Sequence, residues 1–153
     1  MLLEIGKQCL SSYLESWKIN EVNMHWFIGF LMLATATFAD VKDEVQSTIT
    51  SQLDAFLQDD FASAFEYASP SIQRMFRNPD NFGMMVQRGY PMVWRPAKSR
   101  FLEFAQDQRG PYQLIEITDS NGRVHTLRYD MLETPAGWRI RGVQVLPGTA
   151  FSS

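Results

Sequence analysis

The sequence has little cysteine or histidine. A single cysteine, Cys9, and two histidines occur in 153 residues. One cysteine excludes an internal disulfide, and zinc sites need several Cys or His side chains at close spacing. No Gly-rich phosphate loop and no Gly-x-Ser-x-Gly nucleophile motif occurs in the sequence. We therefore expect no metal and no cofactor.

Positive charge is also scarce. Fourteen Lys and Arg residues stand against 17 Asp and Glu residues, which gives a net charge of −3. Binding to nucleic acid phosphates needs a basic surface, so this balance argues against a general nucleic-acid-binding protein. The length is that of one domain with a single hydrophobic core.

One long stretch lacks charge altogether. Residues 22–39 carry no formally charged side chain, and residues 26–33 read WFIGFLML. Small residues follow, up to Ala39. A short apolar stretch that ends in small residues is typical of a signal peptide. Thr37 and Ala39 place small side chains at the −3 and −1 positions, so the sequence predicts cleavage after Ala39 and a periplasmic or secreted protein.

The start of the chain leaves alternatives open. Residues 1–23 hold two Lys and three Glu, whereas a signal peptide begins with positive charge. Met24 directly precedes the apolar run, so translation from Met24 is one alternative. An uncleaved membrane anchor is another, although a spanning helix needs about 20 apolar residues. A buried helix is the third. An uncleaved signal segment is the only membrane contact that we expect.

The residues after Asp40 predict helices. Apolar residues recur every three or four positions over residues 40–57, which is typical of an amphipathic helix with Asp40 as its N-cap. Asp60 is expected to cap a second helix, and Ser69-Pro70 to begin a third that Asn78-Pro79 ends. A last helical segment is expected from Asn81 to Gly89.

The C-terminal third predicts strands. The apolar period changes to two after Pro91, with candidate strands at 98–105, 112–118, 124–133 and 138–146. Asn121-Gly122 is a strong hairpin signal. The alternation of the last strand shifts by one residue around Gly142, which predicts a β-bulge. Helices followed by a curved antiparallel sheet give an α+β fold.

Several stretches carry a family resemblance. They are residues 52–60 (QLDAFLQDD), 69–72 (SPSI), 82–86 (FGMMV), 90–94 (YPMVW) and 137–143 (GWRIRGV). This pattern is similar to a bacterial family, domain of unknown function 4864, and the element order resembles the cone of the nuclear-transport-factor-2-like superfamily, which includes SnoaL-type cyclases and ketosteroid isomerases. The resemblance implies a cone-shaped, often exported protein without an assigned activity. We expect this domain at residues 40–148, after an N-terminal extension and signal peptide at 1–39 and before a tail at 149–153.

Such a cone would enclose a pocket between its helices and its sheet. Aromatic side chains with a few polar groups suit a small apolar ligand, and they suit a filled core equally well. The candidate lining residues are Phe65, Tyr67, Met85, Tyr90, Trp94, Tyr129 and Trp138.

The sequence offers two candidate catalytic residues. An isomerase of the ketosteroid type needs a carboxylate base beside hydroxyl donors. Asp130 is the nearest candidate, but it and Tyr129 are consecutive on a strand and should face opposite ways. A cyclase-like site needs a histidine with an orienting acid, and His125 has no evident partner.

Arginines gather in the middle of the chain. Arg74, Arg77 and Arg95 are candidates for an anion or surface site, although solvated arginines explain the pattern as well. We expect a non-catalytic module that binds a small apolar ligand or a protein. The alternatives are an isomerase-like or cyclase-like enzyme that uses the cone pocket, and a subunit that forms a homodimer through its sheet.

Overall fold

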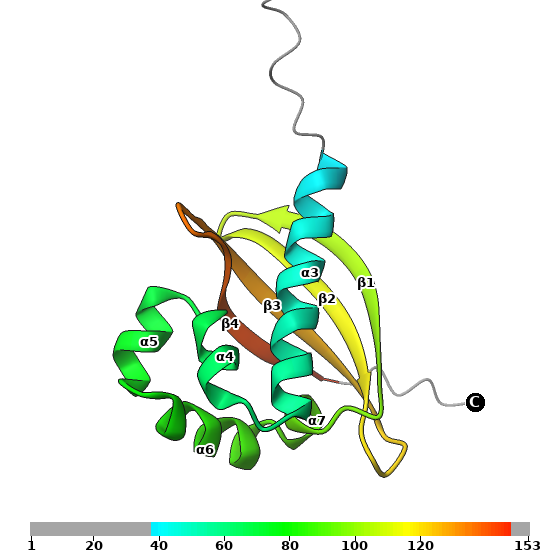
Figure 1. The fold of residues 1–153 in the computed structure, drawn as a ribbon. Coiled ribbons are helices and arrows are strands. Elements are labelled where there is room, and N and C mark those ends of the chain that lie inside the picture. The colour runs from blue at the N-terminus through cyan, green and yellow to red at the C-terminus, as the bar shows by residue number, and fades with distance from the viewer. Residues whose placement is uncertain (1–37, 148–153) are drawn as a thin grey trace, which may run out of the picture. The chain divides into compact units, whose positions relative to one another are not determined.

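The computed structural model describes residues 38–147 (Figure 1). The expected signal segment, the Met24 start and the tail at 149–153 lie outside the described residues. Within residues 38–147, no helix combines the length and the apolar character needed to cross a membrane. The helices are α3 (Phe38–Leu57), α4 (Phe61–Glu66), α5 (Pro70–Phe76), α6 (Pro79–Gly89) and α7 (Pro91–Trp94). The strands are β1 (Lys98–Asp107), β2 (Gly110–Thr118), β3 (Val124–Thr134) and β4 (Gly137–Leu146).

The long helix α3 forms on the predicted stripe. Val45, Ile49, Leu53 and Phe56 are buried, because a spacing of three or four residues places them on one side of the helix. Asp40 does not cap this helix. The helix already begins at Phe38, so Asp40 lies in its first turn, where a carboxylate still faces the positive end of the helix dipole.

N-terminal capping residues determine where the helices α4 and α6 begin. Asp60 accepts a hydrogen bond from the Ser63 backbone N–H and so begins α4, as predicted. Asn78 caps α6 in the same way through Asn81. The Asn78-Pro79 pair therefore begins the next helix as well as ending α5, and the expected start at Asn81 is two residues late. The four-residue helix α7 was not predicted.

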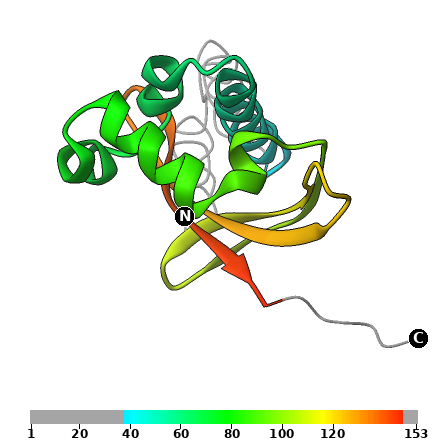
Figure 2. The same cartoon turned by 90° about the horizontal axis from the view of Figure 1, so that it is seen from below.

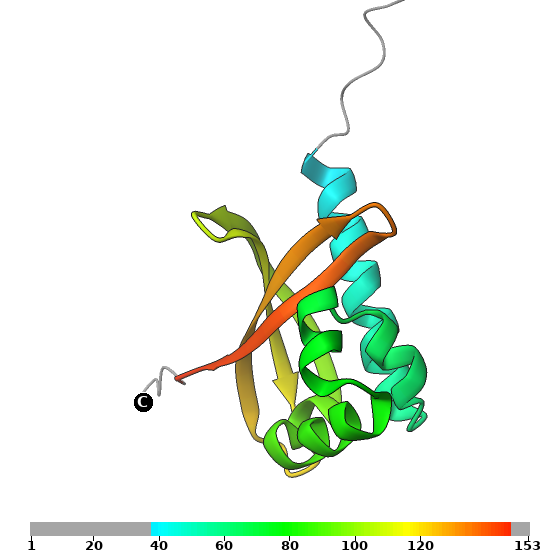
Figure 3. The same ribbon diagram turned by 90° about the vertical axis from the view of Figure 1, so that its left-hand side faces the viewer.

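The four strands form one antiparallel sheet in the order β1-β2-β3-β4. The predicted bulge is present, since Asp130 pairs with Gly142 while Met131 pairs with Ile140, leaving Arg141 as the extra residue. Helices α3 to α7 lie on one face of the sheet (Figures 2 and 3). The expected α+β fold is confirmed.

The core fills the space between the helices and this inner face. Ile115, Ile117, Leu127 and Tyr129 point inward from β2 and β3 and are fully buried. A parallel bridge between Ala68 and Ile140 fastens the α4–α5 connection to β4. The neighbouring residues of β3, Arg128 among them, point to the outer face.

Candidate functional site

An apolar cavity lies between the helices and β4. Its volume is about 260 Å³. Helices α5, α6 and α7 contribute side chains to one side of it, and β4 contributes to the other. The apolar cavity is lined mainly by Phe56, Ile72, Met75, Phe76, Phe82, Met85, Val86, Tyr90, Val93, Ile140 and Val143.

Helix α6 builds much of this wall through one aromatic side chain. The ring of Phe82 lies 6.0 Å from Phe56, 5.2 Å from Phe65 and 5.8 Å from Phe76, measured between ring centroids. The next residue, Gly83, lets α6 approach α4, because a Cβ there would lie 2.7 Å from the ring of Phe61. Any larger residue at this position would push α6 outward and change the wall of the cavity.

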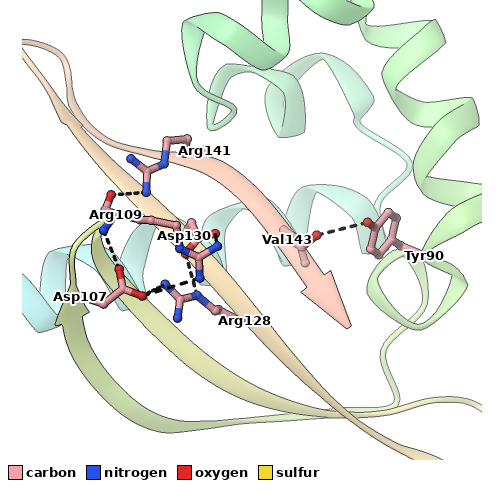
Figure 4. A network of polar contacts seen from close by, with 7 residues as sticks. All are labelled: Tyr90, Asp107, Arg109, Arg128, Asp130, Arg141 and Val143. Carbon is pink, nitrogen blue, oxygen red and sulfur yellow. Dashed lines mark hydrogen bonds and ion pairs between the residues drawn. The ribbon is translucent and has the colours of Figure 1, made fainter. Parts of the chain in front are cut away.

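The polar groups of the apolar cavity are bonded within the chain. Gln52 Nε2 donates to the Ala64 carbonyl at 3.0 Å. The Tyr90 hydroxyl donates to the Val143 carbonyl at 3.2 Å (Figure 4). Among the described lining residues there is no carboxylate and no histidine, and the one charged side chain, Arg141, donates to the Arg109 carbonyl. The rim of the apolar cavity is apolar and adaptable. Met75 is 72% exposed there, and the unbranched methionine side chain adapts its shape readily.

Two of the seven predicted lining residues, Met85 and Tyr90, line the apolar cavity. The structure places the others elsewhere. Phe65 packs behind Phe82, and Tyr67 is half-buried where its carbonyl accepts from the Ile140 N–H. Trp94 donates its indole N–H to Asp59. Trp138 lines a second cavity.

Tyr129, the last of the seven, is a core residue. Its side chain is 0% exposed, and its hydroxyl has no hydrogen-bond partner among the described residues. Burial raises the pKa of Tyr129, and the nearby Tyr90 adds to the effect. The hydroxyl therefore stays protonated and is the one buried side-chain polar atom without a partner in the described part of the chain.

The second cavity lies where the β1–β2 turn meets the start of α3 and the β3–β4 hairpin. Its volume is about 370 Å³. We call it the charged cavity, because two arginines and a glutamate lie in its wall. Besides Arg109, Arg141 and Glu133, it is lined mainly by Val41, Phe104, Pro111, Met131, Leu132 and Trp138. The indole N–H of Trp138 donates to Glu44 of α3 at 3.0 Å, which fixes the orientation of the ring.

A network of charges covers the outer face next to this cavity (Figure 4). Asp130 is only 6% exposed. Arg128 donates to Asp130 at 2.7 Å and to Asp107 at 2.6 Å, and its guanidinium lies 3.8 Å from the centre of the Tyr112 ring. Burial lowers the pKa of Arg128, but the bonds to Asp130 and Asp107 outweigh it and raise the pKa overall.

His125 has a carboxylate partner after all. Its Nε2 lies 3.0 Å from Asp119 Oδ2. The other oxygen of Asp119 accepts from the backbone N–H groups of Asn121 and Arg123. The bond from His125, followed by these backbone bonds, lowers the pKa of Asp119. The pair closes the β2–β3 hairpin, so its role is to hold the turn.

The family model "Domain of unknown function (DUF4864)" matches residues 39–152. The chain belongs to this family. A solved structure from Burkholderia pseudomallei, described as an NTF2-like protein of unknown function, is similar at 18% identity. It matches with a TM-score of 0.34 over 70% of this chain and 92% of that one. No curated protein matches.

The resemblance stated from the sequence is thus confirmed for the DUF4864 family. Neither description names an activity. The site of this DUF4864 domain therefore has to be judged from its own residues.

The predicted arginines do not form one site. Arg95 lies at the C-terminal end of α3, where it donates to the Phe56 carbonyl at 2.8 Å and pairs with Asp59 at 2.6 Å. Hydrogen bonds from Trp94 and then Arg95 lower the pKa of Asp59. Arg74 lies in the last turn of α5 and Arg77 at its cap, both exposed.

Arg109 and Arg141, neither of them a predicted site residue, both line the charged cavity, and Arg141 lines the apolar cavity as well. A signal for Arg141 was present, because the predicted bulge lies directly beside it and bulges redirect side chains.

Proposed function

We propose that this DUF4864 domain is a non-catalytic binding module that takes a small apolar ligand in the apolar cavity. The observation that carries the proposal is a concave, apolar wall whose few polar groups are already hydrogen-bonded within the chain. Small-molecule sites are concave, largely preformed and lined mostly by apolar and aromatic side chains.

The volume sets the size of this ligand. A cavity of roughly 150 Å³ is enough for benzene, whereas sites for drug-sized ligands begin at about 300 Å³. At about 260 Å³, the apolar cavity suits a fused-ring compound or a short acyl chain. Apart from Arg141 at its β4 side, the described lining carries no charge, and the methionine and phenylalanine side chains favour an apolar body.

The positions of the two candidate catalytic residues favour binding over catalysis. A general base must lie within hydrogen-bond reach of the proton that it removes. Asp130 is held on the outer face by Arg128, and His125 is held in the β2–β3 hairpin by Asp119. Neither side chain lines the apolar cavity.

A fluorescent apolar probe tests the proposal. 1-Aminoanthracene becomes bright when it leaves water for an apolar site. We expect it to bind the full chain and to lose at least about tenfold in affinity when Met85→Trp fills the cavity, which corresponds to about 1.4 kcal/mol. Met84→Trp is the matched control, because Met84 is the adjacent residue of α6 and is 45% exposed.

The outcome is decided between these two variants. Both must first show the thermal unfolding transition of the unchanged protein. Equal probe affinity of Met85→Trp and the unchanged protein would contradict the proposal. Native mass spectrometry of the purified protein adds a second test, since a bound compound should disappear in Met85→Trp and remain in Met84→Trp.

We also propose, on the apolar run at 26–33 and the small residues up to Ala39, that the domain acts after export. N-terminal sequencing of the protein recovered from cells tests this. A chain that starts at Asp40 supports it, and an intact Met1 or Met24 contradicts it.

A further inference from the structure

The outer-face network has more positive than negative groups. Arg128 bonds both aspartates at short range, 2.7 Å to Asp130 and 2.6 Å to Asp107. Arg109 reaches the same two carboxylates only at 4.0 Å and 3.6 Å. Arg141 reaches neither. Three arginines therefore share two aspartates. Arg109 holds only the two longer ion pairs and Arg141 holds none, and both line the charged cavity.

Arg141 is the arginine of this network without a carboxylate partner among residues 38–147. It is the extra residue of the β4 bulge, and its guanidinium donates to the backbone carbonyl of Arg109 (Figure 4). A guanidinium has five N–H donors in a planar fork. One carbonyl uses only part of that capacity, so donors remain for an anion.

Besides the two arginines, Gln106 and Glu133, the wall of the charged cavity is apolar. Phe104, Pro111 and Leu132 form part of its wall. Trp138 presents a ring that its bond to Glu44 holds in place. A cation beside flat apolar walls matches a molecule with an apolar body and a negative head, because guanidinium groups bind carboxylates and phosphates through paired hydrogen bonds.

We propose that the charged cavity binds a small organic anion, with its carboxylate or phosphate head on Arg141 and Arg109 and its apolar body against Trp138 and Phe104. This site shares Arg141, but no other described lining residue, with the apolar cavity, and it does not depend on the proposed function. Glu133 lies in the same wall and is exposed. Its negative charge opposes the anion, so the cavity favours a single negative charge over a double one.

Calorimetric titration of the full chain with three probes tests the site. Benzoate and phenyl phosphate carry the two kinds of head on one ring, and benzamide is the neutral counterpart of benzoate. We expect benzoate to bind more tightly than phenyl phosphate, and benzamide not to bind. Binding of benzamide as tightly as benzoate would overturn the proposal, since the arginines would then contribute nothing. Tighter binding of phenyl phosphate than of benzoate would contradict the preference for a single negative charge that we attribute to Glu133.

The benzoate affinities of three variants test where the anion binds. Arg141→Gln removes the charge and should weaken benzoate at least about tenfold, because hydrogen bonds to charged groups are the strong ones. Arg139→Gln is the matched control on the same strand, since Arg139 does not line the charged cavity, and should leave affinity unchanged. Glu133→Gln should strengthen binding, which no loss of folding could imitate.

Nuclear magnetic resonance adds a direct readout. Benzoate should shift the indole N–H signal of Trp138 in the unchanged protein and in Arg139→Gln. No shift of this signal on saturation, or unchanged benzoate affinity in a folded Arg141→Gln, would overturn the proposal. Met85→Trp should leave benzoate binding intact, so this site and the apolar cavity can fail separately.

Discussion

Both faces of β3 carry buried side chains, but different kinds of interaction hold these side chains in place. Leu127, Tyr129 and Met131 are buried on the inner face under the helices. Arg128 and Asp130 lie between them in sequence and on the outer face, where Asp130 is nearly as buried as the core. Apolar burial on the inner face does not depend on direction, whereas each charge on the outer face depends on a partner at a fixed position.

This contrast explains the character of the two cavities. An inner face that is held by non-directional packing tolerates an irregular space, and the apolar cavity is such a space. The outer face must balance its charges, and its surplus arginines lie at the charged cavity. The apolar cavity therefore suits recognition by shape. The charged cavity, whose wall extends from inner-face residues such as Met131 to these arginines, suits recognition by charge.

The largest expected effect comes from the inner face. Leu127→Ala removes a fully buried side chain and should lower the free energy of unfolding by about 3 kcal/mol, since truncation of a core leucine loses its burial and leaves a void. Urea denaturation followed by circular dichroism measures this. Thr126→Ala, one residue earlier and on the outer face, should change stability by less than about 0.5 kcal/mol. A similar cost for both variants would contradict the contrast.

The outer face should respond less to the loss of its central charge. Arg128→Met keeps the length of the side chain and leaves Asp130 without its 2.7 Å partner. Removal of one member of a buried ion pair costs about 3–5 kcal/mol, but Asp107 is partly solvated. We therefore expect a loss of about 2 kcal/mol, measured by the same urea denaturation.

The pH dependence identifies the charge as the cause. The hydrogen bond from Arg128, followed by the Arg109 backbone bond, lowers the pKa of Asp107 below its ordinary value of 3.8. A lowered carboxyl pKa gives stability that is present above 3.8 and lost as the pH falls through the lower folded value. Stability should thus fall with acid in the unchanged protein and fall less in Arg128→Met. Parallel pH profiles would contradict the ion-pair explanation.

Periodicity in the sequence was sufficient to predict the main elements. The stripe of α3 and the alternation of the strands reflect which side chains are buried, so local spacing carries the information. The turn at Asn121-Gly122 follows from local backbone preference, with φ of 79° at Gly122. Helix α7 is not predictable in this way, because its four residues are too few for a period and the apolar pattern changes at Pro91.

The sites could not be predicted in the same way. Arg128, Asp107 and Arg109 meet only because three strands align in one register, which sequence spacing does not reveal. Trp138 and Tyr129 were assigned to one pocket because aromatic composition does not distinguish a cavity wall from a filled core. For His125 and Asp119 the signal was local, because the two residues lie on either side of the predicted Asn121-Gly122 turn and are close in sequence.

The smallest effect is expected at Tyr129, where the two kinds of interaction meet in one side chain. Its ring belongs to the apolar inner face, and its hydroxyl has no hydrogen-bond partner among the described residues. A buried hydroxyl without a partner costs free energy. Tyr129→Phe should therefore raise the free energy of unfolding by about 1 kcal/mol, measured by urea denaturation. Tyr90→Phe is the control and should lower it by a similar amount, because it removes the bond to Val143. Destabilisation by Tyr129→Phe would show that the hydroxyl does have a partner in solution, and the inner face would then contain a polar contact of its own.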